Sequence, residues 1–242
     1  MRKMVILFYL IMSILLLCQV SEAELLVADD FKSKLNNKYW KGQDESWDVN
    51  RGHLEIHREG GDGNGEVDFG YGLIEFEDFG LRLDFHLLVD PFPSKMELLF
   101  RADIDYHFYQ LIITPADGAG RPNSARWYKR EGNDRGTWNE YRELRAEFPF
   151  QVESKMWYTI ALLGDGNNFE LYIKKQGDLI FEKVIEWSDP KNLHPKGVLG
   201  IHTNQLQHYY IDNVYLYDNP GEVNLAVEPQ GKLAVTWANL KQ

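Results

Sequence analysis

The residues with the clearest chemical potential lie on one predicted strand. Between Phe79 and Val89, apolar residues alternate with Arg82, Asp84 and His86, so these three side chains share one face of the strand. A carboxylate and an imidazole on one face could exchange protons with a substrate, and the solvated outer side of a sheet is the structural alternative. Asp84 and His86 are therefore candidate catalytic residues, and Asp105 is a third.

A second group of residues is suited to binding a polyhydroxylated ligand such as a carbohydrate. Aromatic rings stack on the apolar face of a sugar ring, while guanidinium, amide and imidazole groups hydrogen-bond its hydroxyls. Each candidate has a structural alternative, because many aromatic residues must lie in the core and Arg101 could form an ion pair with Asp103 or Asp105. The candidate ligand-binding residues are Arg101, Tyr109, Gln110, Trp127 and His202.

Patterns for glycoside hydrolysis or for metal binding are weak. A retaining glycoside hydrolase needs two carboxylates about 5 to 5.5 Å apart, and the nearest match is Glu75 and Glu77, which would project from one face of a strand. None of the seven histidines has the neighbouring carboxylates of a zinc or iron motif, so no metal site and no cofactor are predicted. A structural Ca²⁺ held by Asp29, Asp30 or Asp212 is a minor alternative.

The N-terminus has the pattern of a secretory signal peptide. Two basic residues precede an apolar run from Met4 to Leu17, and the segment Val20–Ala23 ends in a small residue suited to cleavage after Ala23. The run is short for a membrane span, so we expect an exported bacterial-type protein with no membrane span after cleavage. An uncleaved N-terminal anchor is the alternative. Cys18 is the only cysteine and lies within the leader, so the mature chain forms no internal disulfide.

Charge and length limit the function and the number of domains. The chain has 26 basic and 37 acidic residues and a formal net charge of −11, whereas a nucleic-acid-binding protein needs a basic stripe. Nucleic acid is therefore not an expected partner. We expect a signal peptide over residues 1–23, one β-sandwich domain over 24–218 and a C-terminal tail over 219–242.

Alternating polar and apolar residues predict an all-β domain. Short segments of this kind follow one another from Leu25 to Asp218, separated by clusters of Gly, Asn, Asp and Pro. Two antiparallel sheets, each burying one face against the other, satisfy this pattern. The predicted strands are Leu54–His57, Phe79–Val89, Met96–Arg101, Phe108–Thr114, Arg126–Arg130, Trp157–Leu163, Phe169–Lys174, Ile180–Val184, Val198–Thr203 and Tyr209–Tyr217.

Turns and insertions interrupt the strands. Gly164–Asn168 and Lys175–Asp178 contain residues that tolerate positive φ and are predicted hairpin turns. A short helix is expected around Glu140–Glu147, within a long charged insertion. Asp212 and Asn213 are expected to cap the last strand.

Several segments occur in an order that matches a known family. They are Ala28–Phe31, Trp40, Trp47–Val49, Arg51–Leu54, Glu77–Leu81, Leu99–Arg101, Trp157–Ile160, Gly197–Ile201 and Tyr210–Val214. This order resembles that of concanavalin A-like jelly-roll domains, nearest the laminin-G-like and 3-keto-disaccharide hydrolase-like (DUF1080) groups, and it covers nearly the whole mature domain.

The resemblance implies a two-sheet antiparallel jelly roll with one concave sheet on which relatives place sugars or other ligands. Our first hypothesis is an exported module that binds a glycan on that sheet. The alternatives are a hydrolase of the 3-keto-disaccharide or glycoside hydrolase type and a laminin-G-like adhesion module. Related endoglucanases carry their catalytic carboxylates as E-x-D-x-E on one strand, and this string does not occur in the sequence.

Overall fold

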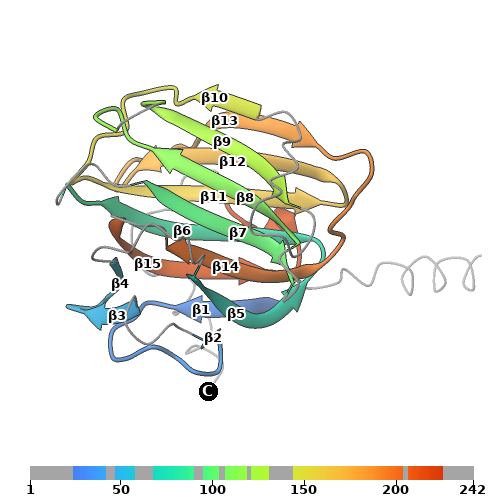
Figure 1. The fold of residues 1–242 in the computed structure, drawn as a ribbon, viewed down its shortest axis with the longest axis horizontal. Coiled ribbons are helices and arrows are strands. Elements are labelled where there is room, and N and C mark those ends of the chain that lie inside the picture. Colours follow the sequence, from blue (N-terminus) through green and yellow to red (C-terminus); the bar gives the residue numbers. More distant parts are fainter. Residues whose placement is uncertain are drawn as a thin grey trace, which may run out of the picture.

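The computed structural model describes residues 24–41, 47–57, 68–89, 95–103, 107–118, 121–130, 144–203 and 207–225. These residues form fifteen strands and one short 3-10 helix, η1 (Pro220–Glu222) (Figure 1). Within them, no helix is long and apolar enough to cross a membrane. The predicted signal peptide, Asp105 and most of the predicted tail lie outside the described residues.

The strands pair into two antiparallel sheets that are stacked as layers (Figure 1). We name each sheet after a central strand. The β6 sheet has the order β13 (Glu182–Ser188), β12 (Asn168–Lys175), β11 (Trp157–Asp165), β6 (Phe79–Leu87), β15 (His208–Tyr217), β4 (His53–His57) and β3 (Trp47–Asn50), with β1 (Leu25–Asp29) also paired to β15. The β8 sheet has the order β10 (Leu144–Glu147), β9 (Ser124–Arg130), β8 (Phe108–Thr114), β7 (Met96–Ala102), β14 (Gly197–Thr203), β5 (Asp68–Phe76) and β2 (Trp40–Lys41).

One apolar core lies between the two layers, and alternation along the strands builds it. On β6, Phe79, Leu81, Leu83, Phe85 and Leu87 are all fully buried and belong to this core. Strands of the β8 sheet contribute their own inward residues to the same core, at alternate positions of β7 and β8. The prediction of an all-β, two-sheet antiparallel sandwich is therefore confirmed.

The predicted hairpin turn between β11 and β12 is present, and it requires a glycine at two positions. Asp165 pairs with Asn168, and Gly166 between them has a φ of +55°, which favours glycine. Gly164 faces a different constraint, because a Cβ at this position would lie 2.3 Å from the ring of Phe79. The hairpin thus depends on one glycine for its backbone conformation and on another for close packing.

Three local expectations were wrong. Leu144–Glu147 is an edge strand rather than part of a helix, because its backbone pairs with β9. Asp212 and Asn213 do not cap β15 but form an irregularity inside it, where Asn213 has a φ of +49°. Glu77 does not share a strand with Glu75, because β5 ends at Phe76.

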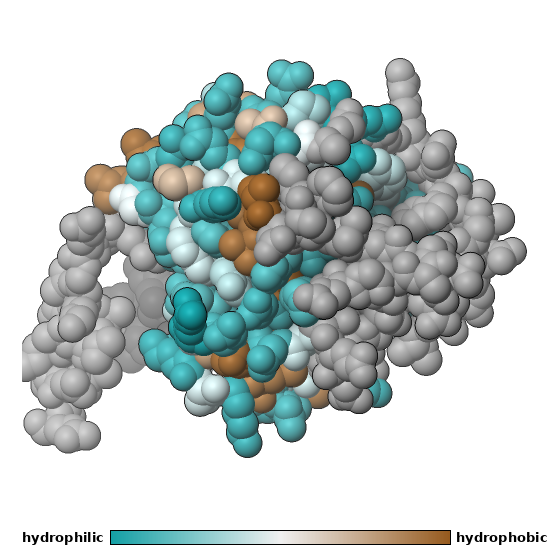
Figure 2. Space-filling view, turned by 60° about the vertical axis from the view of Figure 1, so that its left-hand side comes forward, coloured by the Kyte–Doolittle hydropathy of each residue, from teal (hydrophilic) through white to brown (hydrophobic). Residues whose placement is uncertain are grey.

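The surface on one side of the molecule is mostly hydrophilic where the structure describes it. Figure 2 shows one side of the molecule, on which hydrophilic residues predominate and apolar residues reach the surface in small separate groups. Scattered apolar side chains of this kind are ordinary for a folded protein. The described part of this side therefore carries no broad apolar docking area.

Candidate functional site

The predicted catalytic pair lies on the outer face of the β6 sheet. Asp84 is 6% exposed, and its carboxylate accepts hydrogen bonds from Thr159 Oγ1 at 2.5 Å and Asn213 Nδ2 at 2.9 Å. The His86 ring lies between those of Trp157 and Tyr210, at centroid distances of 5.2 and 5.8 Å, and burial lowers the pKa of His86. Asp84 links neighbouring strands, and a catalytic role for the pair stays a prediction.

Arg101 is a buried anchor at the end of β7. Its φ of +48° turns the side chain inward, where the guanidinium lies over the ring of Phe169 at 5.0 Å. Nε donates to the main-chain oxygen of Glu77 at 2.9 Å, Nη1 donates to that of His194 at 3.3 Å, and Nη2 lies 3.6 Å from Asp78 Oδ1. Arg101 is 1% exposed, and burial lowers its pKa. These contacts tie three segments together at one end of the sandwich.

Tyr109 and Trp127 also point into the core. The Tyr109 hydroxyl donates to Asp189 Oδ2 at 2.8 Å, and burial raises the pKa of Tyr109 well above its usual value. Trp127 is 2% exposed and packs against Trp187 at a ring distance of 5.5 Å. The structure therefore separates both residues from the outer face of the β8 sheet.

Gln110 and His202, in contrast, meet on the outer face of the β8 sheet through Glu97. Gln110 Nε2 donates to Glu97 Oε2 at 2.6 Å, and His202 Nδ1 lies 2.5 Å from the same oxygen. Gln207 Nε2 donates to Glu97 Oε1 at 2.9 Å, and Lys95 Nζ lies 2.7 Å from that oxygen. Four side chains, from strands β8 and β14 and from the segments just before β7 and β15, thus converge on one carboxylate. We call these five residues the Glu97 cluster.

The electrostatics of the cluster keep Glu97 ionised. Its side chain is 2% exposed, and burial by itself would raise the pKa of a carboxyl group. The charge and hydrogen bond of His202, followed by those of Lys95, outweigh this effect and lower the pKa of Glu97 to about 2. Glu97 is therefore a fixed negative centre that orients the donors around it.

Two polar atoms of the Glu97 cluster have no hydrogen-bond partner among the described residues. They are Gln110 Oε1 and His202 Nε2, in side chains of residues that are 1% and 3% exposed. The amide nitrogen of Gln110 and Nδ1 of His202 are bonded to Glu97, whereas the opposite atoms of both groups are buried and unpaired. An unsatisfied buried polar atom costs about 1–3 kcal/mol, which a hydrogen bond from a ligand would recover.

Tyr128 and Arg126 lie beside the cluster on the neighbouring strand. Tyr128 on β9 pairs with Gln110 on β8, so the two side chains are cross-strand neighbours on the outer face. Arg126 lies two residues before Tyr128, and its Nη1 donates to the Tyr128 hydroxyl at 3.1 Å. Both residues are half-buried and form a more open side of the site. Glu97, Tyr128 and Arg126 were not among the predicted site residues.

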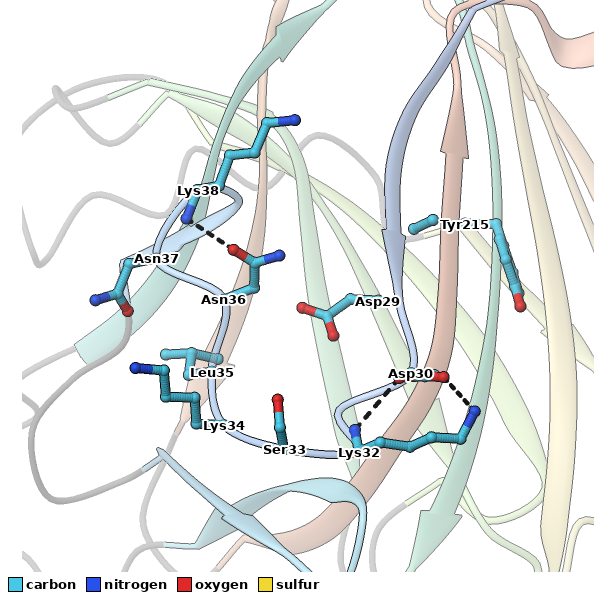
Figure 3. A pocket seen from close by; sticks show the side chains of 11 residues that line it. Asp29, Asp30, Lys32, Ser33, Lys34, Leu35, Asn36, Asn37, Lys38 and Tyr215 are labelled. Carbon is cyan, nitrogen blue, oxygen red and sulfur yellow. Dashed lines mark hydrogen bonds and ion pairs between the residues drawn. The ribbon is translucent and has the colours of Figure 1, made fainter.

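A hollow of about 560 Å³ lies elsewhere, between the loop after β1 and Tyr215 of the β6 sheet (Figure 3). It contains two of the three aspartates considered for Ca²⁺. Asp29 accepts hydrogen bonds from Trp40 Nε1 at 2.9 Å and the Phe31 amide at 3.0 Å, and Asp30 is paired with Lys32. Among the described residues, no group of three or more histidine, cysteine, aspartate or glutamate side chains could hold a metal ion.

Comparisons with known proteins address the fold. No protein-family model and no curated protein sequence matches the chain. Among solved structures, the chain is similar to SCLam, a non-specific endo-β-1,3(4)-glucanase from family GH16, with a TM-score of 0.57, 10% identity and coverage of 81% of this chain and 91% of that chain. The catalytic domain of an endo-1,3-β-glucanase (laminarinase) from Thermotoga petrophila gives a TM-score of 0.55 at 12% identity, covering 83% and 99%.

A third similar structure is a protein of unknown function with a galectin-like fold from Bacillus subtilis. Its TM-score is 0.55 at 14% identity, and the match covers 81% of this chain and 98% of that one. The chain folds as a concanavalin A-like jelly roll. At these identities the likeness shows the fold alone, and this fold is the one that the sequence resemblance implied.

Within this jelly roll, the outer face of the central strand β8 carries no ionisable group. Its outward residues are Phe108, Gln110, Ile112 and Thr114, because Tyr109, Leu111 and Ile113 belong to the core. The E-x-D-x-E arrangement expected of related endoglucanases therefore has no counterpart on this strand. Strand β8 itself therefore offers hydrogen bonding and apolar contact on its outer side.

Proposed function

We propose that the protein is an exported, non-catalytic glycan-binding protein and that the glycan binds the outer face of the β8 sheet. The observation that carries the proposal is the pair of unpartnered buried atoms, Gln110 Oε1 and His202 Nε2, held in place by the Glu97 carboxylate. Planar amides and imidazoles at fixed positions are suited to sugar hydroxyls. The concanavalin A-like fold, shared with two glucanases, supports the same ligand class.

Tyr128 supplies the second element of a sugar-binding site. Its half-buried ring stands next to Gln110 on the adjacent strand. A sugar ring stacked on Tyr128 would present its hydroxyls toward the cluster, since neighbouring strands lie about 4.8 Å apart. Stacking and hydrogen bonding would then act on one sugar residue.

The charge state of Glu97 favours binding over hydrolysis. Both retaining and inverting glycosidases use two carboxyl groups, one of which must be protonated to act as the acid. Glu97 has a pKa of about 2, and both its oxygens already accept hydrogen bonds. Among the described residues of β7, β8, β9 and β14, it is the one carboxylate on the outer face. The second group that hydrolysis requires is missing from these strands.

Calorimetric titration of the mature protein, residues 24–242, with a panel of neutral and acidic oligosaccharides tests the proposal. Tyr128→Ala and Gln110→Leu should each weaken binding of the best ligand about tenfold, because a stacked ring and a ligand hydrogen bond each contribute roughly 1 kcal/mol. Tyr210→Ala and Gln176→Leu are the matched controls, since both residues lie on the outer side of the β6 sheet, where Gln176 bonds to Asp84. Thermal melts check that each variant folds.

The outcomes discriminate between functions. Loss of affinity in the two β8-sheet variants with unchanged controls supports glycan binding at this face. Equal losses in the controls would move the site to the other sheet and overturn the proposal. Turnover of any oligosaccharide, measured by reducing-end release, would contradict the non-catalytic part of it.

A further inference from the structure

Two arginines oppose each other beside the Glu97 cluster. Arg126 on β9 pairs with Arg145 on β10, so both side chains lie on the same outer face. The inward positions of β10 confirm this direction, because Leu144 packs against the core. Like charges directly opposite each other on neighbouring strands are destabilising. Such a pair needs a compensating anion or a functional reason.

The protein supplies little compensation for these charges. Arg126 Nη1 and Nη2 donate to the hydroxyls of Tyr128 at 3.1 Å and Thr114 at 3.4 Å, which are neutral, and Arg126 Nε has no partner. In the part of the chain that the structure describes, Arg145 has one carboxylate within range, that of Glu147 at 3.9 Å, and the Glu147 side chain is 81% exposed. An exposed ion pair at this distance contributes little. Among the described residues, the Arg126 guanidinium thus has no counter-charge.

The local excess of positive charge at Arg126 and Arg145 contrasts with the composition of the chain. The chain has 37 acidic and 26 basic residues, so acidic side chains are abundant. At the Glu97 cluster, by contrast, the carboxylate is fully engaged by His202, Lys95 and two amides. A surplus of positive charge therefore remains on the β9–β10 side of the site. A negatively charged ligand group would satisfy it.

The spacing of the site fits one acidic sugar chain. Arg126 on β9 pairs with Ile112 on β8, and Ile112 pairs with Glu97 on β7, so Arg126 lies two strand spacings, or about 10 Å, from Glu97. Tyr128 is the next outward residue after Arg126 on the same strand. A ligand stacked on Tyr128 can therefore reach the Glu97 cluster with its hydroxyls and Arg126 with an anionic substituent.

We infer that the ligand is an acidic glycan, whose carboxylate or sulfate group binds between Arg126 and Arg145 while its hydroxyls bind the Glu97 cluster. This inference rests on the proposed function, since it specifies the sugar class that the same face would bind. Guanidinium groups bind both kinds of oxyanion through paired hydrogen bonds, so the two sources share their recognition chemistry.

Titration with ligand pairs that differ only in charge tests the inference. Oligogalacturonate is compared with its methyl ester, and sulfated carrageenan oligosaccharides are compared with their desulfated forms. We expect the acidic member of at least one pair to bind about tenfold more tightly than its neutral form. The pair that shows the difference identifies carboxylate or sulfate as the group bound. Poly-glutamate, a polyanion without sugar rings, should not bind.

Variants assign the charge preference to the two arginines. Arg126→Gln and Arg145→Gln should each lower the ratio of the affinity for the acidic ligand to the affinity for its neutral form toward one. Arg82→Gln is the matched control, because Arg82 lies on β6 in the other sheet. Equal affinity for both members of every pair, or binding of poly-glutamate, would overturn the inference but leave glycan binding intact. Failure of every oligosaccharide to bind would overturn the proposed function as well.

Discussion

Replacing Glu97 by glutamine keeps the shape of the side chain and removes its charge, so Glu97→Gln tests whether the cluster is built around a buried carboxylate. The pKa of Glu97 is lowered from 4.5 to about 2 in the folded protein. A difference of about 2.5 in pKa corresponds to about 3 kcal/mol of folding free energy at 1.36 kcal/mol per pH unit. Because the Glu97 side chain is 2% exposed, solvent screening reduces this value little.

The sign of the pH dependence follows from the direction of the change in pKa. A carboxyl group whose pKa is lower in the folded state stabilises the protein fully above its unfolded pKa, here 4.5, and that stabilisation is lost as the pH falls through about 2. Glu97→Gln lacks this group. We therefore expect the variant to be about 3 kcal/mol less stable than the unsubstituted protein at pH 7, with a difference that shrinks between about pH 4.5 and pH 2.

Urea unfolding at a series of pH values measures this difference, and thermal melts should show a gap of about 6–12 °C at pH 7 for a chain of this size. Glu147→Gln is the control, because the Glu147 side chain is 81% exposed and its substitution should leave the stability unchanged. A Glu97→Gln protein as stable as the unsubstituted one at pH 7, or a difference that stays constant to pH 2, would refute the reasoning.

Three further predictions concern packing, the buried arginine and processing. Gly164→Ala should destabilise the protein by about 1–3 kcal/mol, because its Cβ would lie 2.3 Å from the Phe79 ring. Gly166→Ala meets nothing within 4 Å and should cost about 1 kcal/mol because of its φ of +55°. Equal losses of stability for the two variants in urea unfolding would contradict the packing role of Gly164. Arg101→Met should lower the unfolding free energy by about 3 kcal/mol and leave the glycan affinity of the folded protein unchanged, whereas a selective loss of affinity would support the predicted ligand role of Arg101. Mass spectrometry of the protein exported by a bacterial host should show cleavage after Ala23, and retention of residues 1–23 would contradict the predicted signal peptide.

Alternation predicted the faces of β6 but not those of β8 and β9. On β6, polar and apolar residues alternate, and Asp84 and His86 lie together on the outer face as predicted. On β8, all seven residues of Phe108–Thr114 are buried, and apolar residues lie on both faces of the strand. Its sequence therefore shows no alternating period. Tyr109 and Gln110 are consecutive and must face opposite sides of the sheet, so they could not share one site.

The same one-residue relation separates Trp127 from Tyr128. Trp127 was among the predicted ligand-binding residues and Tyr128 was not, but Trp127 packs in the core and Tyr128 lies on the outer face. The pairing of Gln110 with Tyr128 shows which of the two rings shares the outer face with Gln110, and the structure provides that register. Glu97 lies inside the strand Met96–Ala102, which reads as an apolar segment, and its role appears only when Gln110 and His202 are placed beside it.

Arg101 shows a different limit, because a local backbone conformation reversed its direction. Glu97 and Leu99 face outward, and strict alternation would place Arg101 with them. Instead, Arg101 adopts a φ of +48° next to a register shift between β7 and β14, and its side chain enters the core. A bulge of this kind depends on the pairing of strands distant in sequence, so alternation along one strand does not reveal it.

A crystal structure of the mature protein with its tightest-binding oligosaccharide would locate the bound sugar. We expect a sugar ring stacked on Tyr128, with hydroxyl groups within hydrogen-bond distance of Gln110 Oε1 and His202 Nε2. An oligosaccharide bound on the outer face of the β6 sheet, or in the hollow beside Tyr215, with those two atoms still unpartnered, would contradict this expectation.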